Sequence, residues 1–126
     1  MSRPTKAIID LQALRHNFDL AQSLAPKSDT MPMVKANAYG HGAIEVATAL
    51  ASMAAAFGVA SIDEALELRQ GGISQPILLL EGIFDRDEVD LAAHHNLCLL
   101  LAHNRNLMAV LNVNLAHHVK VGLRMH

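Results

Sequence analysis

Cysteine, tryptophan and tyrosine are scarce in this 126-residue sequence, which has one, none and one of them respectively. The single cysteine, Cys98, excludes an intrachain disulfide. The leucines on both sides of it favour a small buried side chain rather than a nucleophile. Because no intrachain disulfide can form, a reducing cytoplasm is the expected compartment.

Long apolar runs and clusters of like charge are also missing. No apolar segment approaches the length of a transmembrane helix, and the brief apolar run that ends at Asp10 does not predict a signal peptide. The formal net charge is −2 and the basic residues are scattered, so neither a nucleic-acid surface nor a membrane surface is expected as a partner. Hydrophobic residues make up 52% of the chain, enough for the core of one modest domain.

Short apolar runs alternate with amphipathic stretches along the chain. After a strand-like run at 7–9, Asp10 stands at the N-cap of a helix whose apolar residues are Leu11, Leu14, Phe18, Ala21 and Leu24. Further strands are expected at 31–35, 57–60, 77–80, 97–101 and 119–125, with helices at 43–54, 62–70, 86–94 and 104–111. This alternation, roughly every 20 to 25 residues, predicts an α/β fold of right-handed βαβ units around a parallel sheet. Periodicity alone does not separate an open sheet from a closed barrel, although the first strand lacks a dinucleotide fingerprint.

One lysine stands at the end of a strand-like run and is followed by a turn of small residues. Burial lowers the pKa of a lysine, which suits Lys35 to attack a carbonyl and form a Schiff base. Tyr39 adds a phenol, and Gly40 and Gly42 allow backbone N–H groups to approach an anion before the next helix. Together these residues predict a site for an aldehyde cofactor with a phosphate. The alternative is that Lys35 simply reaches solvent and Tyr39 packs as an ordinary aromatic side chain.

The nine residues Val34–Gly42 resemble the pyridoxal-phosphate attachment motif of alanine racemases. The resemblance implies that Lys35 attaches the cofactor and that Tyr39 contacts its phosphate. His41 belongs to the motif, and a structural role in the turn is expected, with proton transfer as the alternative. Further segments similar to the family follow in the same order. In one of them, Leu80 falls where the family has a residue that lines the cofactor pocket. The alternative is that Leu80 is an ordinary core residue of a strand. The Val-Lys-Ala-Asn core alone is shared with basic amino-acid decarboxylases.

The resemblance also implies a fold and an activity. Its fold is a (β/α)₈ TIM-type barrel with pyridoxal 5'-phosphate at the C-terminal mouth; this chain supplies about five of the eight strands, and residues 1–10 contribute a strand to a second domain. Its activity is the interconversion of L- and D-alanine for peptidoglycan synthesis by a cytoplasmic homodimer. Lys35 would move the proton on one face of alanine, and a tyrosine of the partner subunit would act on the other face. Tyr39, the sole tyrosine, already fills the phosphate position.

The C-terminal residues and the eight histidines complete the candidate positions. A gapless alignment sets Arg124 against a lysine that is often carbamylated in the family, and the arginine that binds the cofactor then lies beyond residue 126. Aligning Met125-His126 with the family's Met-His pair is the alternative, and Lys120 is the other candidate for the lysine position. The adjacent pairs His94-His95 and His117-His118 match no metal-binding pattern, so no metal is expected.

Three functions remain open from the sequence. The chain is expected to be the N-terminal part of an alanine racemase. The alternative is a truncated, inactive remnant that at most binds pyridoxal phosphate or a partner chain. A small cofactor-carrying protein of the pyridoxal-phosphate homeostasis type is less well supported, because such proteins lack the Ala-Tyr-Gly-His-Gly extension.

Overall fold

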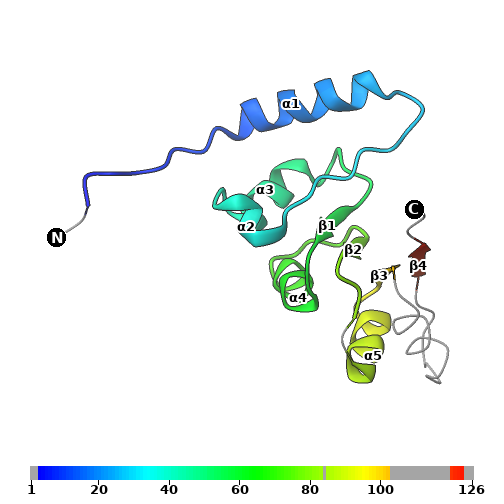
Figure 1. Cartoon of the computed structure of the whole chain (residues 1–126). Coiled ribbons are helices and arrows are strands. Elements are labelled where there is room, and N and C mark those ends of the chain that lie inside the picture. Colours follow the sequence, from blue (N-terminus) through cyan, green and yellow to red (C-terminus); the bar gives the residue numbers. More distant parts are fainter. Residues whose placement is uncertain (1–2, 84, 103–119, 124–126) are drawn as a thin grey trace.

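The computed structural model describes residues 3–83, 85–102 and 120–123. Its elements in chain order are α1 (Leu11–Leu24), α2 (Lys35–Tyr39), α3 (Ala43–Leu50), β1 (Phe57–Val59), α4 (Ile62–Gln70), β2 (Ile77–Leu79), α5 (Arg86–His94), β3 (Leu97–Leu101) and β4 (Lys120–Leu123). Figure 1 shows α1 beside α3, and the N-terminal segment extending away from the other elements. The helix expected at 104–111 lies outside the described residues.

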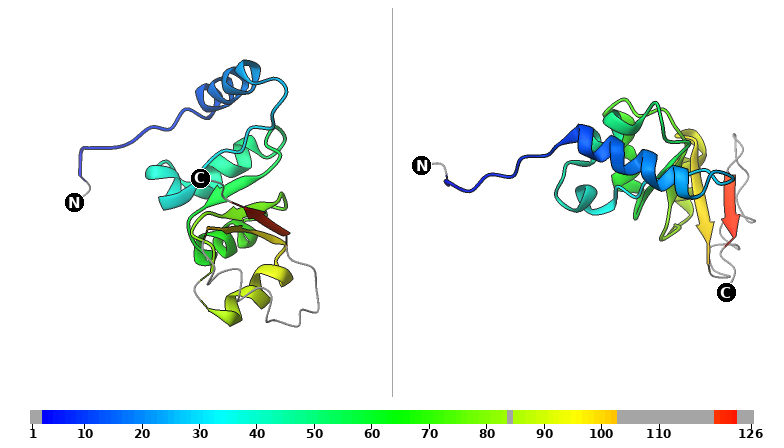
Figure 2. Two further views of the ribbon diagram at one scale, coloured as in Figure 1. Left: turned by 45° about the vertical axis from the view of Figure 1, so that its right-hand side comes forward. Right: turned by 90° about the horizontal axis from the view of Figure 1, so that it is seen from above.

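The four strands form one parallel sheet in chain order, β1-β2-β3-β4. Met33 adds a parallel bridge to Gly58, so the expected strand at 31–35 is reduced to one paired position. Pro32 has no N–H to extend the ladder towards the N-terminus, and the backbone becomes left-handed directly after Lys35. The parallel order is confirmed, and a strand lies in each of the other four expected ranges. β1 and β2 end one residue earlier than expected, and of 119–125 the structure describes 120–123. The two views of Figure 2 show the strands side by side.

Side chains cap the helices where the sequence predicts that they do. The Asp10 carboxylate accepts hydrogen bonds from the Gln12 and Ala13 amides, both at 3.0 Å. Capping boxes open α4 and α5, led by Ser61 and Asp85 respectively. Helix α3 is shorter than expected because its last amides bond three residues back, from Ala51 to Thr48 and from Met53 to Leu50, which ends the regular helix at Leu50.

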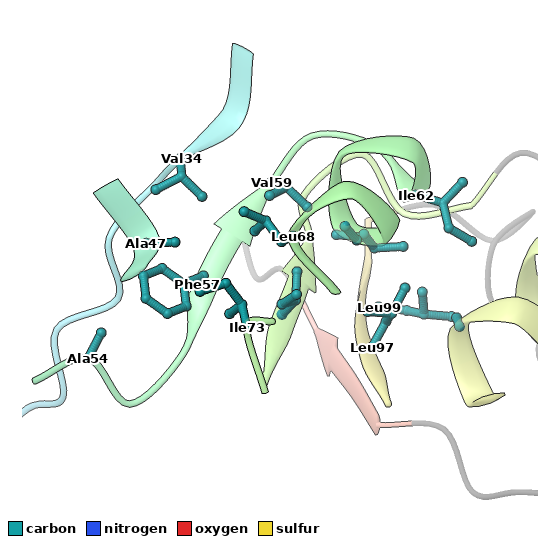
Figure 3. Close-up of a cluster of buried hydrophobic side chains, with 14 of the residues drawn as sticks. Val34, Ala47, Ala54, Phe57, Val59, Ile62, Leu68, Ile73, Leu97 and Leu99 are labelled. Atoms are coloured by element: carbon teal, nitrogen blue, oxygen red, sulfur yellow. The ribbon is translucent and has the colours of Figure 1, made fainter. Parts of the chain in front are cut away.

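One face of the sheet carries the core. Phe57, Ile77 and Leu97 are in register on adjacent strands and are at most 1% exposed. They pack with apolar residues of α3, α4 and α5, as Figure 3 shows for part of the cluster. Leu78, Cys98 and Leu100 alternate with these core residues and are only half-buried. The expectation that Cys98 is buried is therefore wrong, because in the described residues the helices cover one face of the sheet only.

The N-terminal segment lies outside this core. Helix α1 is joined to α3 by the Arg15 Nε–H, which donates to the Ala49 carbonyl at 2.8 Å, and by the buried Phe18. The expected strand at 7–9 does not form, because none of the described strands pairs with it, and Ile8 is 79% exposed. Assignment of this segment to a second domain stays a prediction.

Candidate functional site

The candidate residues come from the carboxyl ends of neighbouring parallel strands. Lys35 follows the bridged Met33–Val34 segment and Leu80 directly follows β2. Between them, the Val59 carbonyl at the end of β1 accepts a hydrogen bond from the Leu80 amide at 2.9 Å. The carboxyl ends of parallel strands share one edge of a sheet, and in α/β proteins this edge holds the ligand site. The fold therefore brings Lys35 and Leu80 to the same edge.

The turn after Lys35 has an unusual backbone. Ala36, Asn37, Ala38 and Tyr39 all have φ between 52° and 54°, and Gly40 follows with φ 88°. A left-handed conformation costs a non-glycine residue about 1–2 kcal/mol, and it is normally found at single residues. The turn is closed by a hydrogen bond from the Ala38 amide to the Val34 carbonyl at 3.0 Å. Such concentrated strain persists only where the surroundings hold it, and it is often found at functional sites.

The glycines of this turn do not offer an anion site. The Gly40 and Gly42 amides both donate to the Asn37 carbonyl at 3.1 Å, and the Ala43 amide donates to the Asn37 side chain at 2.9 Å. These donors are used inside the turn, so the expectation that they approach a phosphate is wrong. His41 has the structural role expected of it, since its Nδ1 lies 2.8 Å from the Ala38 carbonyl.

The two reactive side chains of the motif are accessible. Lys35 is half-buried, and across the described part of the chain its amine has no hydrogen bond or ion pair. Tyr39 is 68% exposed, although it belongs to a turn with a buried neighbour, Ala38. The Lys35 amine can form a Schiff base with an aldehyde, and the Tyr39 phenol at the same turn can donate a hydrogen bond to a phosphate. The residues present therefore fit pyridoxal phosphate.

Glu64 reaches this site from another βα unit, and the sequence did not single it out for that role. Its Oε2 accepts a hydrogen bond from the Ala36 amide at 2.6 Å, while its Oε1 accepts from the amides of Ala60 at 3.1 Å and Ser61 at 3.3 Å. The capping-box pattern predicts only the bond to Ser61. No sequence signal connects Glu64 to a residue 28 positions earlier.

Other candidate positions lie apart from this edge. A cavity of about 270 Å³ is lined by Ile8, Ile9, α1 residues and His41, and neither Lys35 nor Leu80 borders it. Among residues 3–83, 85–102 and 120–123, no three potential metal ligands gather, and no helix is long and apolar enough to cross a membrane. The His94 and His95 rings pack edge to face with centroids 5.0 Å apart. Lys120 is exposed in β4, whereas Arg124, Met125-His126 and His117-His118 lie outside the described residues.

The fold and the site define a class: a parallel βα protein with a reactive lysine at the carboxyl edge of its sheet. Residues 9–126 match the family described as alanine racemase, N-terminal domain, and the chain belongs to this family. It is 47% identical over 123 residues to the catabolic alanine racemase of Pseudomonas aeruginosa, covering 98% of this chain and 34% of that protein. It is 49% identical to an alanine racemase of Xanthomonas oryzae pv. oryzae, again over 98% of this chain and 33% of that protein.

Solved structures agree with this assignment. The biosynthetic alanine racemase from Pseudomonas aeruginosa superimposes with a TM-score of 0.84 at 44% identity, covering 90% of this chain and 32% of that one. A histidine racemase from Leuconostoc mesenteroides superimposes with a TM-score of 0.75 at 32% identity, over 88% of this chain and 30% of that one. The chain thus spans about a third of the length of the relatives it matches. Its sheet is the N-terminal part of the (β/α)₈ barrel.

Proposed function

We propose that this chain is the cofactor-attaching part of an alanine racemase that uses pyridoxal 5'-phosphate. The observation that carries the proposal is the Lys35 amine, which stands without a described partner at the carboxyl edge of the sheet. Support comes from the family match and from relatives of 46–49% identity that are named alanine racemases. One of the similar structures is a histidine racemase, so proteins of this fold differ in the side chain of the amino acid named as substrate.

Three residues of this chain have roles in the proposal. Lys35 attaches the cofactor, the Tyr39 phenol donates a hydrogen bond to its phosphate, and Leu80 lines the pocket from the end of β2. When bound, the cofactor supplies an electron sink that makes the Cα proton of the amino acid acidic. Lys35 then takes or returns that proton on one face, a role that suits a lysine beside the reacting carbon.

The other face needs a second proton-transfer group. Tyr39 is the only tyrosine of the 126 residues, and it is already assigned to the phosphate. The resemblance to alanine racemases implies a tyrosine of a partner subunit at this place, so we propose that the full protein is a homodimer whose partner subunit supplies this acid/base from residues beyond these 126. The product D-alanine would be used for peptidoglycan synthesis in the cytoplasm. One relative, in contrast, is named a catabolic alanine racemase.

A second candidate function is a remnant that binds the cofactor or another chain without racemising alanine. The observation that favours it is the coverage, since the chain spans about a third of the length of its relatives. The half-buried second face of the sheet, with Leu78, Cys98 and Leu100, is consistent with either candidate, because in a barrel that face is the interior.

Complementation distinguishes the two candidates. The complete reading frame that contains residues 1–126 is expressed in a bacterial strain that requires D-alanine. The racemase proposal predicts growth without D-alanine, loss of growth with Lys35→Ala, and normal growth with Lys27→Ala as the matched control. Soluble protein without growth favours the remnant, and growth that survives Lys35→Ala rules out the assigned role of Lys35.

A further inference from the structure

The Glu64 carboxylate joins two parts of the chain that are far apart in sequence. It lies in the first turn of α4, where its Oε1 completes the capping box with the Ser61 amide and also accepts from Ala60. Its Oε2 is directed to the other side, where it accepts from Ala36, the residue that follows Lys35. A capping box needs only one of these oxygens, so the bond to Ala36 is an additional function of this side chain.

The hydrogen bond to Ala36 acts on the peptide group that follows Lys35 and so affects the backbone conformation of Lys35. The Ala36 N–H belongs to the peptide that leaves Lys35, so fixing its direction fixes the ψ angle of Lys35. At 2.6 Å to a carboxylate oxygen, it is a short hydrogen bond, and its acceptor is charged, which strengthens such bonds. It also falls at the first left-handed residue, which is where the strained backbone begins. The carboxylate therefore stabilises the left-handed turn. Through the turn it also fixes the direction in which the Lys35 side chain leaves the end of the strand.

We propose that Glu64 is a positioning residue for Lys35: through the Ala36 amide it holds the left-handed turn, and with it the lysine, in the geometry that attaches the cofactor. This inference rests on the proposed function only for the role of Lys35. The hydrogen bond itself, and its effect on the turn, can be measured without the cofactor.

Substitutions separate positioning from capping. In Glu64→Gln the carboxamide has one acceptor oxygen, which we expect to stay with the nearby Ala60 and Ser61 amides, so Ala36 loses its acceptor. Glu64→Asp keeps the charge at the start of α4 but is one methylene shorter, so it does not reach Ala36 and the capping amides together. Glu88→Gln is the matched control, because Glu88 completes the capping box of α5 in the same way. Glu67→Gln, an exposed position of α4, controls for the change in charge.

Two measurements on the 126-residue chain test the proposal. The first is hydrogen exchange of the Ala36 amide by NMR without cofactor. Loss of a hydrogen bond to a charged group predicts exchange about 10- to 100-fold faster in Glu64→Gln and Glu64→Asp, with no change in either control variant. The second is the dissociation constant of pyridoxal phosphate by equilibrium dialysis. It is expected to rise about tenfold in both Glu64 variants and to stay within about twofold in Glu67→Gln and Glu88→Gln.

The outcomes are distinct. Unchanged Ala36 exchange in both Glu64 variants, or affinities equal to that of Glu88→Gln, overturns the positioning role. The Lys35→Ala variant reports on the proposed function separately: if it binds the cofactor as tightly as the original chain, Lys35 is not the attachment point. In that case the Ala36 exchange rates still decide whether Glu64 holds the turn.

Discussion

Arg69 connects three consecutive parts of the fold, and its removal tests how the βα units are held together. From α4 its guanidinium donates to the carbonyls of Ile73 and Gln75, both at 2.7 Å, in the loop before β2. It also donates to the carbonyls of His95 at 2.9 Å and Asn96 at 3.1 Å, in the turn before β3. Burial lowers the pKa of Arg69 from its ordinary value, which indicates that desolvation opposes part of the gain.

The expected cost of Arg69→Met follows from these four bonds. A hydrogen bond to a charged donor contributes about 1.5–3 kcal/mol, but the Asn96 bond is exposed and the desolvation of the guanidinium is recovered on substitution. Methionine keeps most of the apolar stem, so packing changes little. We therefore expect a loss of about 3 kcal/mol in the free energy of unfolding, a large part of the total for a small domain. Arg69→Lys should lose about 2 kcal/mol, because a single ammonium does not form the guanidinium's fork.

Urea unfolding followed by circular dichroism measures this loss as a lower midpoint at unchanged slope. Lys27→Met removes an exposed cation and serves as the control, with an expected change within about 0.5 kcal/mol. A loss below about 1 kcal/mol for Arg69→Met, or an Arg69→Lys variant as stable as the original chain, would refute the reasoning that the guanidinium ties the two loops to α4.

Two further predictions concern the sheet next to the site. Phe57, which is 0% exposed, should cost about 3–5 kcal/mol in urea unfolding when replaced by alanine, whereas the 53% exposed Leu20 should cost under about 0.5 kcal/mol; equal effects would contradict the placement of the core. A Cβ on Gly58 would meet the flexible end of the Met33 side chain, which must move aside, so Gly58→Ala should cost about 1 kcal/mol, and adding Met33→Ala should recover part of it. An additive double variant would show that the two side chains do not meet.

Elements with a local signal were predictable from the sequence. Asp10, Ser61 and Asp85 stand at helix starts because short polar side chains satisfy the free amides there, and the structure has all three caps. The β3 strand has the predicted bounds because its apolar run is continuous and starts directly after the polar Asn96. The expected position of Lys35 at the carboxyl edge followed from the same alternation of strands and helices.

Features that depend on distant partners were not predictable. The left-handed turn contains two alanines, which disfavour that conformation on their own, and only Asn37 and Gly40 are residue types that adopt it readily. The bonds of Glu64 to Ala36 and of Arg69 to His95 join residues 28 and 26 positions apart. Their side chains look like an ordinary cap and an ordinary surface arginine in the sequence. The expected strand at 7–9 failed for a related reason, since an extended segment becomes a strand only beside a partner.

The most direct test of the account is the site at which pyridoxal phosphate attaches. The chain is incubated with a limiting amount of cofactor, reduced with borohydride, digested and mapped by mass spectrometry over its four lysines, Lys6, Lys27, Lys35 and Lys120. Reduction in urea gives the reference for unfolded chain, in which the four lysines compete without a structured site. The folded chain should be labelled at Lys35, and Lys35→Ala should leave only the pattern of the unfolded chain. Labelling at Lys6, Lys27 or Lys120 with Lys35 unmodified would contradict it.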